Sequence, residues 1–182
     1  MPLPTLSADQ VEWVAQQVVG YIGQQCQTYR PGAAPLTVSQ KTVMRPFFPD
    51  SALNSARLVV LAGQRVNNPR FYGELIQMGF APADLPDFAH MVAITFVDTV
   101  VSHETFTDRL LFHELVHVVQ YAKLGLPEFA AKYVKGFLRG GSYVAIPLEM
   151  NAYELDARFA AEPAQPFSVA NDVQAWLDGG RF

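Results

Sequence analysis

Cysteine and charged side chains are scarce in this 182-residue chain. Cys26 is the only cysteine, so no disulfide can form within the chain and no zinc site can be built from thiolates. Only 16% of the residues are charged, and the formal net charge is -4. Lys and Arg form no cluster that could follow a phosphate backbone, which argues against nucleic acid as a partner. The sequence also lacks a G-x-S-x-G segment, a phosphate-binding loop and a Cys/His pair.

Long apolar runs are missing as well. The most apolar segment, residues 91–101, is interrupted by Asp98 and is too short to span a bilayer. The first residues show no basic segment followed by an apolar one, so no signal peptide is visible. We therefore expect no membrane span and a cytoplasmic location by default, while export without a cleaved signal would leave no mark in the sequence. Half of the residues are hydrophobic, which suits a single folded domain over residues 1–182.

The apolar spacing predicts helices at both ends of the chain and strands between them. Residues 8–29 follow a capping box at Ser7 and form one amphipathic helix that packs on the main body. Thr37-Val38-Ser39 is interpreted as the start of a short strand. Stronger strand patterns occur at 56–61 and at 90–101, where Asp98 allows the segment to bend or to pair with itself. Helical patterns occur at 71–78, 105–124, 127–140, 147–161 and 170–177. Strands that precede helices indicate an α+β fold with a small, mostly antiparallel sheet.

The chemistry of the sequence is concentrated in residues 113–117, which read H-E-L-V-H. On a helix, His113 and His117 are one turn apart on the same face, so both imidazoles can bind one metal ion. Glu114 then lies beside the water molecule at the open position of that ion. This pattern is typical of zinc hydrolases. The expected helix begins at Thr105, which we interpret as its N-cap, and ends near Gly125.

A catalytic zinc site needs a third protein ligand. The metzincin pattern would require a histidine at position 123, but Lys123 occupies it, so that class is excluded. Residues 113–117, together with the later segment Glu149-Met150-Asn151-Ala152-Tyr153, resemble the gluzincins. These include thermolysin-like enzymes, heat-shock membrane endopeptidases and short uncharacterised bacterial zincin domains that carry H-E-x-x-H-V-x-Q. The resemblance covers residues 90–160.

The resemblance implies a zincin-like fold, one Zn²⁺ per chain, and Glu149 as the third ligand. Glu154, Asp156 and Glu128 are alternatives for that role. One departure from the family pattern lies at Tyr153, where gluzincins have an aspartate that orients a ligand histidine. Asp156 is on the same helix face as Glu149 but about 10 Å further along the axis. Either Asp156, a backbone carbonyl or Asp98 must then orient the histidines.

The expected activity is that of a metallopeptidase in which Glu114 is the general base toward a zinc-bound water. Tyr153, Tyr143, Tyr133 and His103 are candidate donors to the oxyanion. In zincins an exposed sheet edge binds the extended substrate, which would assign that role to strand 90–101. His90 is expected at the surface.

The partner in this interpretation is a peptide or protein substrate, and the oligomeric state stays open. One alternative is a catalytically silent zincin-fold module that binds metal or another protein. A second alternative is a helical protein in which the motif occurs by chance.

Overall fold

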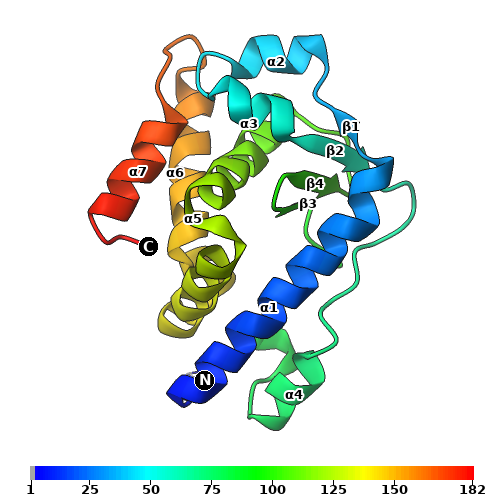
Figure 1. Cartoon of the computed structure of the whole chain (residues 1–182), viewed down its shortest axis with the longest axis vertical. Helices are drawn as coiled ribbons and strands as arrows, with labels where there is room; N and C mark the ends of the chain where they lie inside the picture. Colours follow the sequence, from blue (N-terminus) through cyan, green and yellow to red (C-terminus); the bar gives the residue numbers. More distant parts are fainter. Residues whose placement is uncertain (1–2) are drawn as a thin grey trace.

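The computed structural model describes residues 3–182, which form seven α-helices and four short strands (Figure 1). The helices are α1 (Ala8–Tyr29), α2 (Val38–Met44), α3 (Asp50–Ser55), α4 (Tyr72–Gln77), α5 (Asp108–Gly140), α6 (Pro147–Ala161) and α7 (Val169–Asp178). The strands are β1 (Ala34–Pro35), β2 (Arg57–Val60), β3 (Ala93–Phe96) and β4 (Thr99–Ser102). The predicted α+β class is confirmed, and helices make up most of the structure.

The sheet is mixed, and two of its three pairings are antiparallel, in keeping with the expected mostly antiparallel sheet. Its strand order is β1-β2-β4-β3. The two outer pairings, β1 with β2 and β3 with β4, are antiparallel, but the central pairing of β2 with β4 is parallel. The parallel pair arises because the chain returns through α4 to the edge strand β3 and then reverses in a hairpin. That reversal aligns β4 with β2 and leaves β3 at the edge beside α5.

The segment expected as a strand over 90–101, bent or paired near Asp98, is a hairpin of two strands, β3 and β4, so it is not one continuous strand. The turn lies at Val97 and Asp98, and Val97 has φ of 63°, a conformation that β-branched residues rarely adopt. The main-chain oxygen of Asp98 accepts from the amide of Arg57, and its carboxylate pairs with Arg30. Asp98 indicated this turn in the sequence, but Val97 did not, because valine is not a turn-forming residue.

The expected strand at residues 37–39 is wrong too, because this segment starts helix α2. The Thr37 side chain accepts from the amide of Gln40, and the Gln40 side chain accepts from the amide of Thr37. The β-branched residues Thr37 and Val38 suggested a strand. The reciprocal capping interactions determine the local structure instead, as they do at Ser7 for α1.

Helix α1 has the predicted bounds and packs across the edge of the sheet. Its buried residues Val14, Tyr21 and Ile22 belong to one hydrophobic cluster with Phe96 of β3 and Tyr121 of α5. All four residues of β3 are at most 9% exposed. The expected exposed edge for an extended substrate is therefore not exposed, because α1 covers it.

Helix α5 runs through the middle of the molecule, between α1 and the sheet on one side and α6 and α7 on the other (Figure 1). Its N-cap is Thr107, which accepts from the amide of Leu110, so the expected start at Thr105 is two residues early. Gly125, with φ of 73° and ψ of 160°, interrupts the helix at the predicted position. Residues 111–121 are all buried.

A second hydrophobic cluster lies on the other side of α5 and holds α6 in place. The rings of Phe112 and Phe159 are stacked with centroids 4.5 Å apart, and Phe47 packs edge-on against both. With apolar clusters on two sides, the polar groups of the motif are enclosed on a helix that the core fixes. In the described part of the chain, no helix has the length and apolar character that crossing a bilayer requires.

Candidate metal centre

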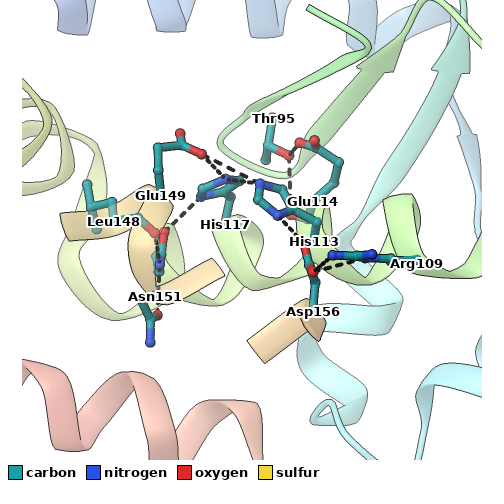
Figure 2. A network of polar contacts seen from close by, with 10 residues as sticks. Thr95, Arg109, His113, Glu114, His117, Leu148, Glu149, Asn151 and Asp156 are labelled. Carbon is teal, nitrogen blue, oxygen red and sulfur yellow. Dashed lines mark hydrogen bonds and ion pairs between the residues drawn. The ribbon is translucent and has the colours of Figure 1, made fainter. Parts of the chain in front are cut away.

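Three buried side chains converge between α5 and α6 (Figure 2). His113 and His117 project from successive turns of α5, and their Nε2 atoms are 3.2 Å apart. Glu149 lies in the first turn of α6, and its Oε2 is 3.5 Å from Nε2 of His113 and 3.4 Å from Nε2 of His117. Each of the three residues is at most 7% exposed. The third member expected from the resemblance is thus beside both histidines.

The spacing of these three atoms fits a metal ion. Two ligand atoms bound tetrahedrally at about 2.05 Å lie about 3.3 Å apart. The three separations are 3.2, 3.4 and 3.5 Å. In the part of the chain that the structure describes, Oε2 of Glu149 is buried without a hydrogen-bond donor. A buried carboxylate oxygen in that state is costly unless a cation compensates it. His113, His117 and Glu149 could therefore hold a metal ion.

The electrostatics of the three groups also favour a cation. Burial lowers the pKa of His113, but the hydrogen bond with Asp156 and the nearby carboxylates of Glu149 and Glu114 outweigh this effect and raise the pKa to about 10. The pKa of His117 is raised in the same way, by Glu149 against the effect of burial. Burial raises the pKa of Glu149, but the two histidines outweigh it and lower the pKa to about 2. Without a metal, protons on the imidazoles supply the positive charge that the carboxylate needs.

Asp156 orients the first histidine. Its Oδ2 accepts from Nδ1 of His113 at 2.9 Å, so Nε2 of that ring points toward Glu149. The other carboxylate oxygen accepts two hydrogen bonds from Arg109, at 3.0 and 2.8 Å. Helix α6 runs antiparallel to α5. Asp156, two turns after Glu149 on α6, therefore lies beside Arg109, which is one turn before His113 on α5. Among the groups considered for orienting the histidines, Asp156 is therefore the one that contacts His113.

Gln120 orients the second histidine. Its Oε1 accepts from Nδ1 of His117 at 2.9 Å. Its amide nitrogen donates at 3.0 Å both to the main-chain oxygen of Leu148 and to Oδ1 of Asn151. One fully buried glutamine therefore connects the motif helix to the first turn of α6, next to Glu149. This connection fixes the third candidate ligand relative to His117.

Glu114 lies beside the cluster and is held by strand β3. The hydroxyl of Thr95 donates to Oε2 of Glu114 at 2.6 Å and also contacts its main-chain oxygen at 3.2 Å (Figure 2). Glu114 is 4% exposed and, with His117 and Glu149, lines a cavity. The carboxylate of Glu114 therefore lies next to the three converging ligand atoms but does not belong to that set. It is available to exchange protons with a molecule in the cavity.

The four candidate oxyanion donors lie in different places. Tyr143 and Tyr133 line the cavity that Glu114 lines. Tyr153 instead packs its ring on His113, with centroids 4.6 Å apart, and is 42% exposed. His103 is occupied elsewhere, since its Nε2 accepts from the amide of Val66 and its Nδ1 donates to the main-chain oxygen of Met91. Both of its ring nitrogens are engaged, so His103 is not a donor to the site.

The alternative acids are placed away from the two Nε2 atoms. Glu154 pairs with Arg181, and Glu128 pairs with Lys132. Asp98, considered as a partner for the histidines, pairs with Arg30 in the hairpin turn. His90 is exposed and contacts Asp87. None of these four residues belongs to the buried cluster of three.

Sequence reasoning missed Thr95, Arg109 and Asn151. Threonine is common in strands, so Thr95 gave no signal until the hairpin was seen against α5. Arg109 did carry a signal in the sequence, because it lies four residues before His113 and thus on the same helix face. Asn151 is marked only by its place between Glu149 and Asp156 on α6.

Comparisons of the chain with protein-family models, with curated proteins and with solved structures find no match.

Proposed function

We propose that this protein is a zinc-dependent hydrolase of the gluzincin type that cleaves peptide bonds or closely related amides. The observation that supports it most is the convergence of three buried ligand atoms at tetrahedral spacing, with an acidic side chain beside them that is not part of the set. Two imidazoles and one carboxylate are the donors of catalytic zinc sites such as that of thermolysin. A zincin-like fold is part of the proposal.

The metal in such a site polarises the substrate carbonyl and makes a water molecule more acidic. His113, His117 and Glu149 would hold it, and Asp156 and Gln120 keep the two imidazoles in the tautomer that presents Nε2. Glu114 accepts the proton of the attacking water and passes it to the leaving amine. Thr95 fixes one oxygen of Glu114 through its hydroxyl, so the other oxygen is directed to the reaction.

Tyr143 is the best-placed donor to the developing oxyanion among the four candidates. It lines the same cavity as Glu114 and Glu149. Burial, followed by the charge of Glu149, raises the pKa of Tyr143 well above its ordinary value, so the phenol stays protonated at neutral pH. A protonated phenol donates a hydrogen bond to an oxyanion. Tyr133, whose pKa is raised by the same causes, is second.

Two measurements test the proposal. Metal analysis of the purified protein should find about one zinc per chain, and His117→Ala should lose it. Hydrolysis of a peptide library by the native protein should disappear in Glu114→Gln, which keeps its zinc. Absence of bound zinc would contradict the metal site. Bound zinc without cleavage of any peptide or folded protein would support a catalytically silent metal-binding module instead.

A further inference from the structure

One cavity of about 100 Å³ begins at the metal centre and continues away from it along α1. Its near end is formed by Thr95, Glu114, His117 and Glu149. Its far end is formed by Leu75 of α4 and by Phe80, which follows that helix. In Figure 1, α4 lies beside the first half of α1, far from α6. The cavity therefore connects the candidate metal centre with a distant, apolar part of the molecule.

The two ends of the cavity differ in polarity. Its carboxylates and its histidine are all at the near end. Further along, the lining is aliphatic and aromatic, and two of its tyrosines direct their hydroxyls to main-chain oxygens: Tyr21 to Asn67 and Tyr72 to Pro86. No lysine or arginine among residues 3–182 lines it. A phosphate or carboxylate deep in the cavity would have no countercharge.

The cavity is long and narrow. Val14 and Ile22 of α1 both line it, and these residues are about 12 Å apart along the helix axis. Leu6, which precedes the helix, extends the lining further. The centre of a water-sized sphere can move through about 100 Å³ of this space, which leaves room for a slender group. An extended alkyl chain of about ten carbons has the matching length, given carbon–carbon bonds of about 1.5 Å.

We propose that this cavity binds an unbranched alkyl or acyl chain of the substrate, with the substrate's carbonyl group at the metal centre. The inference rests on the proposed function for the position of the carbonyl, whereas binding of the chain follows from the cavity itself. The ligand class is a neutral amphiphile, such as a fatty acyl amide or a lipid-modified peptide. Its polar head lies at Glu114 and Glu149, and its methyl end lies toward Leu75.

A series of primary amides tests this proposal: butanamide, hexanamide, octanamide and decanamide, titrated calorimetrically into the full-length protein with and without zinc. Each added methylene group should tighten binding about two- to fourfold, because it is buried against apolar surface. The gain should stop once the chain exceeds the length of the cavity. Binding that does not change with chain length would overturn the proposal. Tighter binding of 3-phenylpropanamide than of octanamide would overturn it in favour of an aromatic side chain.

The matched variants lie next to each other on α1. Val18 lines the cavity, and Val19 does not belong to the lining. Val18→Trp should fill the cavity and weaken octanamide binding at least tenfold, whereas Val19→Trp should leave it within twofold. Equal effects of the two variants would contradict the proposed location. If Val18→Trp fails to fold, which circular dichroism will show, Val18→Phe provides the same comparison with a smaller ring.

Failure of the chain-binding proposal and failure of the proposed function give different results. Chain-length dependence in Glu114→Gln and in the zinc-free protein supports the cavity as a ligand site even if no peptide is cleaved. Conversely, cleavage of short polar peptides together with no dependence on chain length overturns this inference and leaves the hydrolase proposal intact.

Discussion

Asp156 accepts a hydrogen bond from Nδ1 of His113 over 2.9 Å. The same carboxylate is bound by the exposed Arg109 through two nitrogens, so its position is fixed from both sides. A carboxylate in this position sets the tautomer of the histidine and increases the basicity of the opposite ring nitrogen. The acid that orients the first candidate ligand thus comes seven residues after Glu149, one turn later than position 153.

Asp156→Ala should weaken zinc binding about 10- to 100-fold, because His113 loses the partner that directs its Nε2 to the metal. Competition with a chromophoric chelator measures this, at a temperature below the unfolding transition of the variant. Glu154→Ala is the control, since Glu154 is on the same helix but is exposed and pairs only with Arg181. Equal affinities of the native protein and Asp156→Ala would show that Asp156 does not support the site.

Zinc binding should depend on pH, because the metal and protons compete for the same nitrogens. The pKa of His113 in the metal-free chain is about 10, so this ring is protonated at neutral pH and must lose a proton to the solvent when the metal binds. Apparent affinity should therefore rise about tenfold per pH unit between about pH 6.5 and 9, for one proton displaced. Calorimetry in buffers of different ionisation enthalpy counts the protons released. Affinity independent of pH would contradict this account.

The stability of the metal-free chain should fall as the pH rises, whereas the affinity for zinc should increase. Since the folded-state pKa of His113 is raised above its ordinary value of 6.5, its contribution is fully present below pH 6.5 and is lost as the pH rises toward 10. The melting temperature of the metal-free chain should fall over this range. Zinc-loaded protein, in which a metal replaces the proton, should lose this dependence.

Gly136→Ala tests how closely α6 must approach α5. A Cβ at Gly136 would lie 2.6 Å from Cδ of Pro147, the first residue of α6, and 3.3 Å from Cγ2 of Ile146. The start of α6 must then shift, and Glu149 in its first turn shifts with it. We expect a loss of about 1–3 kcal/mol in the free energy of unfolding and weaker zinc binding.

Gly20→Ala is the matched control for this substitution. Gly20 is in α1, and a Cβ there would meet nothing within 4 Å. Alanine should stabilise that helix by about 0.5–1 kcal/mol, with no effect on zinc binding. Urea denaturation and chelator competition measure both variants. An unfolding free energy that increases in Gly136→Ala as well would show that the contact between the two helices adapts without cost.

The sequence predicted the parts of the site that lie on one helix and left open the parts that depend on how helices meet. His113, Glu114 and His117 share a helix, so their relative positions follow from helical geometry alone. Asp156 could not be assigned over Asp98 or a main-chain carbonyl, because the decision depends on the antiparallel packing of α6 against α5. Thr95 could not be recognised without the hairpin, in whose turn Val97 has no sequence signature.

The same distinction applies to the fold. Helices whose ends carry a capping box or a proline, such as α1 and α6, were predicted with nearly correct bounds, because these signals are local. The direction of β4 relative to β2 was not predicted, since it follows from the position of β3 at the edge of the sheet. The burial of β3 beneath α1 is also a tertiary effect. It changes the expected binding surface from an open sheet edge to a cavity that β3 helps to line.

Thr95→Val tests whether the hydroxyl of Thr95 positions Glu114 for proton transfer. The substitution preserves the shape of the side chain but removes the 2.6 Å hydrogen bond to Oε2. Because misplacement of a general base reduces its contribution, kcat for a cleaved peptide should fall by about ten- to hundredfold, with KM and zinc content unchanged. Thr95→Ser keeps the hydroxyl and should restore most of the rate. If Thr95 had only a structural role, Thr95→Val would lower the stability of the protein without a selective fall in kcat. Thr95→Ser would then not restore the rate.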